Sequence, residues 1–440
     1  MSATIPGLSS TASPGTRDAA IEAWRWERFD QALRPGVMGP RLATALGGVA
    51  RTCHVVDAKF EPGVRATVLY EYDGRLVRGD LVSTTEGPEV GLVVPPGVRL
   101  FPLPHDPGIV ALPTVLDGAR LGPAIWEALP EGLRTVGAGW ACRVSLLRYR
   151  PGRRATVLVR YPRSRRFVAK AYHDPAKGAA VAREAAALAG ATHYSSTGAL
   201  RLPPTVAHVE TLGLVVQGHV DGVPLDQMLR TGTGRRGEAR AALAHAARAV
   251  AALHETLDVT VRQRPVEREL RRFAERARRA SDVDPELGIS SGRLAQRLEH
   301  TLRSLPPALV GTTHGDCKPG QFLVTRDGVS MLDLDHLGVS DQAADIGTFL
   351  ATLRQQQLRR SMSSTTLSRS DRTADHATWF LEAYLSVRGD STDRNRMRWQ
   401  EAAALQRKAL RAFSRAPRSP LARALVAESN HCLDLLEEAR

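Results

Sequence analysis

The sequence is short of lysine and aromatic residues, and this shortage bears on the kind of partner the chain can bind. Only five of its 60 basic residues are lysines, the formal net charge is +14, and aromatic residues make up 5% of the chain. Proteins that bind single-stranded nucleic acid interleave basic side chains with aromatic stacking platforms. Here the arginines are spread in short runs without such platforms. The composition therefore argues against a nucleic-acid partner, and an anionic ligand of nucleotide size suffices to account for the charge.

Cysteine and long apolar runs are also scarce. The four cysteines, at positions 53, 142, 317 and 432, are far apart and form no Cys-x-x-Cys pair, so neither a disulfide framework nor a zinc site is indicated. No apolar run is long enough to span a bilayer, and the polar first seventeen residues lack the apolar core of a secretory signal. We therefore expect a disordered tail over 1–19, no membrane partner and a cytoplasmic location.

An internal repeat is the clearest feature of the first half of the chain. Residues 60–72 resemble residues 149–161, and each copy has a Pro-Gly turn followed by alternating β-branched and polar residues. This pattern predicts two β-hairpins. The second copy continues into Val168-Ala169-Lys170, whereas the first has Val77-Arg78-Gly79 at the corresponding place. We interpret the repeat as a duplicated β-rich lobe whose first copy has lost a functional lysine.

The periodicity of apolar residues changes after the second hairpin. Alanine-rich residues 176–190 predict a helix, 212–216 a buried strand, and the chain from about 224 onward is mainly helical. The expected helices of this last part lie at 235–257, 265–280, 291–304, 376–388 and 394–413. We predict an N-terminal cap over 20–138, which ends in a Pro-rich stretch (95–114) and a short helix near 122–129, a β-lobe over 139–220 and a helical lobe over 221–440.

The segment 313–336 carries the strongest chemical signal. A tight loop holds Asp316, an amide follows at Gln321, and Asp333 follows the second strand of a short hairpin. Such a hairpin can bring Gln321 and Asp333 to one end, where two hard oxygen ligands can hold Mg²⁺ against nucleotide phosphates. A loop carboxylate at 316 can accept a proton from a hydroxyl group. The pattern indicates phosphoryl transfer.

From about residue 143 onward, these motifs resemble the aminoglycoside phosphotransferase and choline kinase family of the protein-kinase-like superfamily. The resemblance implies an α+β, bilobal, protein-kinase-like fold with a β-rich N-lobe and a helical C-lobe, to which the cap is added. It implies that Asp316 is the catalytic base, that His314 shapes the loop, that Asp333 binds Mg²⁺ and that Asp345 braces the loop. Lys318, two residues after the base, resembles the catalytic-loop lysine of Ser/Thr protein kinases.

The same resemblance assigns a nucleotide site, for ATP or GTP, in the β-lobe. Lys170 would contact the α- and β-phosphates with Glu184 as its ion-pair partner. The Pro-Gly turn at Gly152 and Arg153 would cover the phosphates with backbone amides and a guanidinium group. The segment Val216, Gln217 and Gly218 would be the hinge that meets the base.

One residue departs from the family pattern. Gln321 stands where the family usually has asparagine, and it carries the same amide on a side chain that is one methylene longer. Glutamine also occupies this place in maltokinase-like sugar kinases. This similarity favours a sugar or an aminoglycoside-like metabolite as the small molecule whose hydroxyl group receives the γ-phosphoryl group.

Alternative functions follow from the same segment. Lys318-Pro319 is compatible with a kinase that acts on Ser or Thr of a peptide, and Gln321 is compatible with a non-catalytic pseudokinase that binds a partner. Asp335 and Asp341 are candidates either for the acceptor site or for capping loops. Cys317 is interpreted as a small packing residue, and no chemistry is assigned to His193, His254 or His336.

Overall fold

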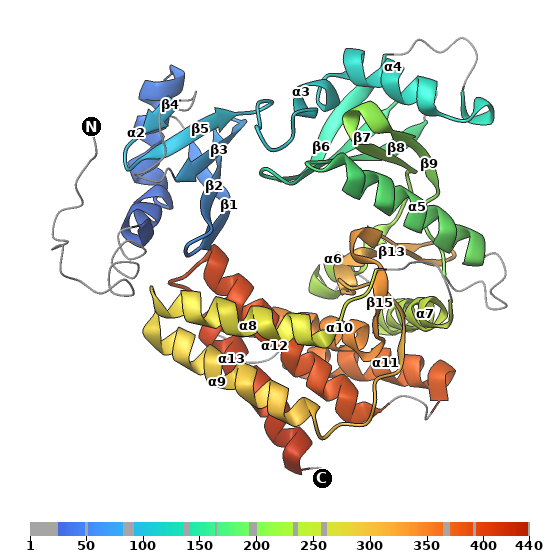
Figure 1. The fold of residues 1–440 in the computed structure, drawn as a ribbon. Helices are drawn as coiled ribbons and strands as arrows, with labels where there is room; N and C mark the ends of the chain where they lie inside the picture. Colours follow the sequence, from blue (N-terminus) through green and yellow to red (C-terminus); the bar gives the residue numbers. More distant parts are fainter. Residues whose placement is uncertain are drawn as a thin grey trace, which may run out of the picture.

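The computed structural model describes ten segments of the chain. They are residues 25–48, 52–81, 92–134, 141–162, 165–192, 200–231, 236–256, 262–363, 370–389 and 393–438. The predicted tail over 1–19 lies outside these residues. Two β-rich units lie above a large helical unit, and the chain runs from one β-rich unit through the other into the helices (Figure 1).

The first unit is a five-stranded antiparallel sheet with the order β1-β2-β3-β5-β4. Its core is formed by the sheet together with helix α2 (Pro35–Leu46) and the helical residues 25–32, and the hydroxyl of Tyr70 in the sheet donates to the carbonyl of Ala32 (2.7 Å). The strands are β1 (Cys53–Glu61), β2 (Arg65–Tyr72), β3 (Arg75–Leu81), β4 (Leu92–Val94) and β5 (Val98–Pro102).

The second unit repeats this topology, with the order β6-β7-β8-β10-β9. The first hairpin closes on the pair Glu61 and Arg65, and the second on the pair Arg150 and Arg154. Both predicted hairpins are thus confirmed. Each turn contains a glycine with positive φ, which the residue type tolerates without steric cost. The elements are β6 (Arg143–Arg150), β7 (Arg154–Arg160), β8 (Arg166–Tyr172), α5 (Pro175–Thr192), β9 (Thr205–Val209) and β10 (Leu214–Gly218).

The helices before the second sheet pack differently from the prediction. Helices α3 (Leu112–Val115) and α4 (Gly118–Ala128), followed by a short 3₁₀ turn (Glu131–Leu133), share a hydrophobic core with the second sheet (Figure 1). The hydroxyl of Tyr161 also donates to the carbonyl of Gly122 (2.7 Å). The predicted cap boundary at 138 therefore separates α4 from the sheet on which it packs. The sequence reveals that α4 has an apolar face, but it does not reveal which of the two sheets packs against that face.

The last unit is mainly helical. Its small sheets are β11-β13-β14 and β12-β15, made of β11 (Val223–Pro224), β12 (Val310–Thr313), β13 (Phe322–Thr325), β14 (Gly328–Met331) and β15 (Gly338–Asp341). The helices are α6 (Leu225–Thr231), α7 (Arg236–Glu255), α8 (Val266–Ser281), α9 (Pro285–Leu302), α10 (Ala343–Ser363), α11 (Ser370–Arg388), α12 (Arg394–Arg415) and α13 (Leu421–Glu438). Helix α9 begins six residues earlier than predicted, because Asp284 caps it by accepting from the Leu287 amide and Pro285 occupies the first helical position.

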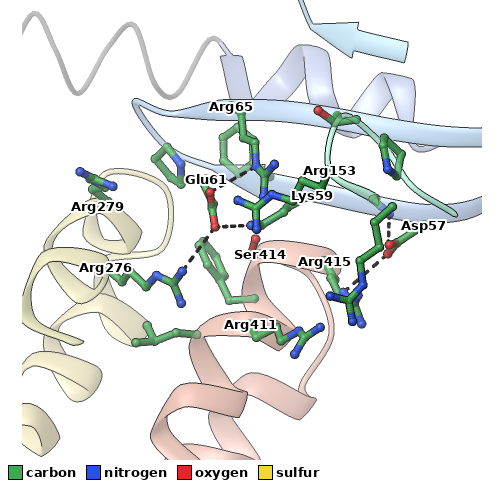
Figure 2. A pocket seen from close by; sticks show the side chains of 18 of the residues that line it. Asp57, Lys59, Glu61, Arg65, Arg153, Arg276, Arg279, Arg411, Ser414 and Arg415 are labelled. Atoms are coloured by element: carbon green, nitrogen blue, oxygen red, sulfur yellow. Dashed lines mark hydrogen bonds and ion pairs between the residues drawn. The ribbon is translucent and has the colours of Figure 1, made fainter. Parts of the chain in front are cut away.

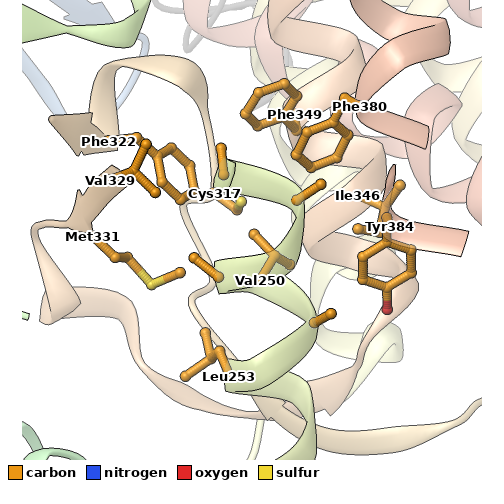
Figure 3. Close-up of a cluster of buried hydrophobic side chains, with 14 of the residues drawn as sticks. Val250, Leu253, Cys317, Phe322, Val329, Met331, Ile346, Phe349, Phe380 and Tyr384 are labelled. Atoms are coloured by element: carbon orange, nitrogen blue, oxygen red, sulfur yellow. The ribbon is translucent and has the colours of Figure 1, made fainter. Parts of the chain in front are cut away.

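A hydrophobic core holds the β13–β14 hairpin against α7, α10 and α11 (Figure 3). The rings of Phe349 and Phe380 are stacked with their centroids 3.8 Å apart, and the buried side chain of Cys317 lies in the same core. Burial raises the pKa of the Cys317 thiol well above its ordinary value. Cys317 is therefore a packing residue, as predicted, and it anchors the loop that carries Asp316.

Candidate active site

The loop between β12 and β13 is held from below by a buried carboxylate. The backbone amides of His314 and Gly315 donate to Asp345 at 2.6 and 2.9 Å, and Nε2 of His254 lies 3.2 Å from the same carboxylate. Gly315 has φ 73°, a conformation that favours glycine. Asp345 thus fixes the start of the loop, and His254 is a buried partner that the sequence pattern did not reveal.

Within this loop, Asp316 lies between a cation and an amide. Lys318 forms an ion pair with Oδ2 of Asp316, and Nε2 of Gln321 donates to the same oxygen at 3.1 Å. Burial favours the neutral carboxyl, but the Lys318 ammonium group outweighs it and lowers the pKa of Asp316 to about 2. The Asp316 side chain is 22% exposed, whereas that of Asp345 is 1% exposed. Of these two carboxylates, only Asp316 can be reached by a ligand.

The amide of Gln321 connects Asp316 to Asp333. Its Nε2 lies 3.4 Å from Oδ2 of Asp333, which is two residues after the end of β14. Asp333 has φ 61° and ψ 57°, a left-handed conformation that is uncommon for a residue other than glycine. Such strain is concentrated at functional sites.

Cations from the second sheet complete the cluster. Nζ of Lys170, on β8, lies 3.0 Å from Asp333 and 3.2 Å from Asp335, and Arg154, on β7, forms ion pairs with both carboxylates. The Tyr172 hydroxyl donates to Asp335 at 2.8 Å. Although burial opposes it, the positive charge of Lys170 and Arg154 lowers the pKa of Asp333 well below its ordinary value. The structure thus brings Asp316, Gln321, Asp333 and Lys170 into one continuous cluster.

Arg154, Tyr172 and Asp335 have a larger part in this cluster than their sequence pattern indicates. In the sequence, Arg154 resembles an ordinary arginine at the end of a turn that could face phosphates. Arg65 occupies the equivalent position of the first hairpin, so nothing in the repeat distinguishes Arg154. Asp335 is one of three acidic residues within 333–341 and carries no motif of its own. Tyr172 could have been found from strand alternation. Residues two apart on a strand face the same side of the sheet, so Tyr172 lies on the same side of β8 as Lys170.

Two predicted nucleotide contacts have a different geometry. Glu184 pairs with Arg262 (3.2 Å) rather than with Lys170. The amide of Gly152 donates to Asp106 Oδ2 (2.7 Å), a carboxylate that also accepts from the Tyr149 hydroxyl (2.5 Å). The Gly152 amide is therefore already hydrogen-bonded to a carboxylate of the protein, which comes from the segment that connects the two sheets.

The predicted hinge also differs. Val216 and Gln217 lie inside β10, which pairs with β8 on one side and β9 on the other. The Gly218 amide donates to the Pro204 carbonyl (2.8 Å) and the His219 amide to that of Arg166 (3.2 Å). Because β10 extends to Gly218, the connection between the lobes is formed by residues 219–222 and begins three positions after the start of the predicted hinge.

The donor set suits a hard divalent cation such as Mg²⁺. The Asp333 carboxylate lies beside the amide group of Gln321, whose Nε2 faces it, and the Asp335 carboxylate is bound to the same lysine. The guanidinium group of Arg154 neutralises Asp333 and Asp335 at this point. A metal ion would therefore compete with Arg154 for the carboxylates, and the Gln321 amide would turn its oxygen toward the ion.

Comparison with known proteins agrees with this geometry. Residues 145–378 match the sequence profile of the phosphotransferase enzyme family. A search of curated protein sequences found no match to this chain. Among the described residues, no helix has the length and apolar character needed to cross a membrane.

Solved structures of small-molecule kinases share the fold. Choline kinase from Cryptosporidium parvum Iowa II superposes with a TM-score of 0.50 at 12% identity, over 73% of this chain and 97% of that one. A glucosamine kinase in complex with glucosamine, ADP and inorganic phosphate has a TM-score of 0.48 at 16% identity, over 93% of this chain and 99% of that one. An amicoumacin kinase with AMP-PNP and Ca²⁺ has a TM-score of 0.45 at 13% identity, over 67% and 88%. The predicted bilobal, protein-kinase-like α+β fold is confirmed.

Proposed function

This chain belongs to the phosphotransferase enzyme family, and we propose that it transfers the γ-phosphoryl group of ATP or GTP to a hydroxyl group of a sugar or aminoglycoside-like metabolite. The observation that carries the proposal is the meeting of Lys170, from the second sheet, with Asp333, Gln321 and Asp316 from the helical lobe. Two carboxylates, an amide and a lysine from opposite lobes are the groups needed to bind a metal-bound triphosphate and to orient a hydroxyl.

In this proposal Asp316 orients the acceptor hydroxyl and accepts its proton. Both side-chain hydrogen bonds that it accepts from the described residues go to Oδ2, so Oδ1 is left for the acceptor. Its lowered pKa keeps Asp316 ionised at neutral pH. Lys318, bonded to Oδ2, holds the carboxylate in place and adds positive charge next to the transferred phosphoryl group.

The remaining residues bind the nucleotide. Lys170 would contact its phosphates, and Asp333 and Gln321 would hold Mg²⁺, which neutralises the charge that builds up on the phosphate oxygens. Arg154 lies within reach of the same phosphates once a metal ion takes over the carboxylates. A cytoplasmic location belongs to the proposal, because the four cysteines are all free thiols and the nucleotide is an intracellular substrate.

A radiolabel-transfer assay tests the proposal. The full chain is incubated with γ-labelled ATP or GTP, MgCl₂ and separate panels of sugars, aminoglycosides and peptides. We expect label on a small molecule, with kcat reduced by roughly 10²- to 10⁴-fold in Asp316→Asn, because general-base catalysis contributes about this much. Asp327→Asn is the matched control, since Asp327 is 71% exposed in the turn between β13 and β14.

Other outcomes would support different functions. Label on peptides alone would replace the small-molecule acceptor by a protein substrate. Absence of transfer, together with no thermal stabilisation by nucleotide and MgCl₂, would contradict catalysis and leave the pseudokinase alternative.

A further inference from the structure

A cavity lies between the first β-rich unit and the helical unit. Its volume is about 350 Å³, and most of its lining comes from four places (Figure 2). They are the β1–β2 hairpin, the turn between β6 and β7, the C-terminal half of α8 and the C-terminal half of α12, and one further lining residue comes from the segment after β14. The cap therefore forms one wall of a pocket whose other walls belong to the kinase-like part of the chain.

The lining of this cavity is strongly basic. Two carboxylates, Asp57 and Glu61, line it. The basic side chains are Lys59, Arg65, Arg150, Arg153, Arg276, Arg279, Arg407, Arg411 and Arg415. Such an excess of one sign within a single cavity produces a positive potential and attracts anions.

The two carboxylates are already shared among several cations. Glu61 pairs with Lys59 (2.6 Å), Arg65 (3.3 Å) and Arg276 (3.6 Å), and Asp57 pairs with Arg415 (3.6 Å) (Figure 2). Arg407 pairs with a residue outside the cavity, Glu269. Four further guanidinium groups form no ion pair with any residue in the described segments, namely those of Arg150, Arg153, Arg279 and Arg411.

The crowding of these cations is unfavourable without a ligand. Burial and the neighbouring Arg154 lower the pKa of Arg150 to about 10, and burial and Arg153 lower that of Arg65. Burial and Arg415 likewise lower the pKa of Arg411. Each shift shows that the charged form costs free energy in this place, and an anion would remove that cost.

The cavity lies beside the catalytic loop. His336 lines it, only three residues after Asp333, and both His336 and Arg411 interact electrostatically with Asp316. The lining of the cavity is therefore near enough to the catalytic loop for its charges to act on the Asp316 carboxylate.

The strand register indicates on which side of a bound nucleotide the cavity lies. In the second sheet Phe167 pairs with Gly218 next to the interlobe connection, whereas Tyr172 pairs with Arg154 at the turn that lines the cavity. The five residue steps from 167 to 172 span roughly 17 Å of strand. A nucleotide whose base lies at the connection has its terminal phosphate at the far end, near Lys170 and the turn. With the nucleotide in this orientation, the cavity lies on the far side of the terminal phosphate, which is the side from which an acceptor approaches.

We propose that this cavity binds an anionic group, a phosphate ester or a carboxylate, that the acceptor carries in addition to the hydroxyl that is phosphorylated. This inference rests on the proposed function and narrows the acceptor to an acidic sugar or sugar phosphate, excluding cationic aminoglycosides. It also assigns a role to the cap, which lacks the lysine of the second β-lobe and instead provides the hairpin with Lys59 and Arg65.

The first experiment compares matched acceptors with the full chain, ATP and MgCl₂. Each neutral sugar is tested beside its 6-phosphate, its uronic acid and its amino derivative. The anionic member of a set is expected to have a kcat/KM at least tenfold above the neutral one, with the amino sugar lowest. Equal or better turnover of the neutral or amino sugars would overturn the proposal.

The second experiment locates the anion. Arg279→Ala is expected to raise the acceptor KM about tenfold, as loss of one charge-assisted hydrogen bond does, and to leave the KM of ATP unchanged. Arg272→Ala is the control, because Arg272 is an exposed arginine on the same helix that does not line the cavity. An unchanged acceptor KM in Arg279→Ala and in the double variant Arg276→Ala/Arg279→Ala would overturn the proposal, as would a rise in the KM of ATP alone.

A binding measurement separates this proposal from the proposed function. Inorganic phosphate and pyrophosphate, compared with chloride at equal ionic strength, should raise the melting temperature of the wild-type protein and of Arg272→Ala more than that of Arg279→Ala. No difference among the three proteins would overturn the anion site even if phosphoryl transfer occurs. Absence of transfer to every acceptor would overturn the proposed function and the acceptor role together, whereas the phosphate measurement would still show whether the cavity binds anions.

Discussion

Nζ of Lys170 lies 3.0 Å from Oδ1 of Asp333, although the two residues belong to different lobes and are 163 positions apart in the chain. The same ammonium group lies 3.2 Å from Asp335. Lys170 is therefore held by the loop that follows β14. Helix α5 is connected to the same loop indirectly, because its Glu184 pairs with Arg262, which donates to the Asp335 carbonyl.

This relationship predicts unequal effects of two carboxylate substitutions. Asp335→Asn removes a charged partner of Lys170, so we expect the KM of ATP to rise about tenfold, corresponding to roughly 1.4 kcal/mol. Glu184→Gln leaves Lys170 with both of its carboxylates and should change the KM of ATP less than twofold. Steady-state kinetics with ATP varied at saturating acceptor measures both. A larger effect of Glu184→Gln would show that Glu184, and not Asp335, supports Lys170 during turnover.

Arg154 is expected to stabilise the protein mainly in the absence of metal. It is buried against Asp333 and Asp335, and removing one partner of a buried ion pair costs roughly 3–5 kcal/mol. Arg154→Ala should therefore lower the free energy of unfolding by about this amount in EDTA. A divalent cation replaces the missing charge, so MgCl₂ should stabilise this variant more than it stabilises the wild type. Urea unfolding with and without MgCl₂ measures the difference, and equal stabilisation of both proteins would contradict competition between Arg154 and the metal.

Lys318 is expected to set the acid limit of activity. It lowers the pKa of Asp316 to about 2 against the effect of burial, so the carboxylate loses its charge only in strong acid. In Lys318→Met burial remains and the opposing cation is absent, so the pKa of Asp316 rises. The acid limb of the pH profile of kcat/KM should then move to higher pH, whereas Lys318→Arg, which retains the charge, should keep it near its original position. An acid limb in the same place in all three proteins would exclude Lys318 as the cause.

Asp345 is expected to stabilise the fold above the ordinary pKa of an aspartate. It accepts from the amides of His314 and Gly315, and although burial opposes it, interaction with His254 and His314 lowers its pKa below the ordinary 3.8. Its contribution is therefore fully present above that value and is lost as the pH falls through the lowered pKa. Asp345→Asn should cost roughly 1–3 kcal/mol for each amide left without an acceptor.

Urea unfolding at neutral pH and in acid, with Asp327→Asn as the control, measures this contribution. The difference between the wild type and Asp345→Asn should shrink as the pH falls. A difference that stays constant across this range would indicate that the carboxylate charge is not what stabilises the loop.

The functional groups that lie close together in the chain could be predicted from the amino-acid sequence. The loop with Asp316 and Gln321, the hairpin that returns to Asp333 and the two Pro-Gly hairpins are short segments whose geometry follows from turn residues and strand alternation. The resemblance carried by the same short motifs indicated the phosphotransferase fold. Helices α10 and α13 were not among the predicted helices, although Ser419 and Pro420 mark the start of α13 and the Ser419 hydroxyl accepts from the Leu421 amide.

Contacts between distant segments required the folded protein. The sheet on which α4 packs, the pairing of Glu184 with Arg262, the ion pairs of Arg154 and the basic cavity each join residues that lie from about thirty to several hundred positions apart. Their positions depend on how the lobes pack, and packing depends on the summed shape of many side chains rather than on any local pattern. The sequence alone thus identified the candidate catalytic and metal-binding side chains. The packing of the three units determined which residues those side chains contact and gave the cavity its positive charge.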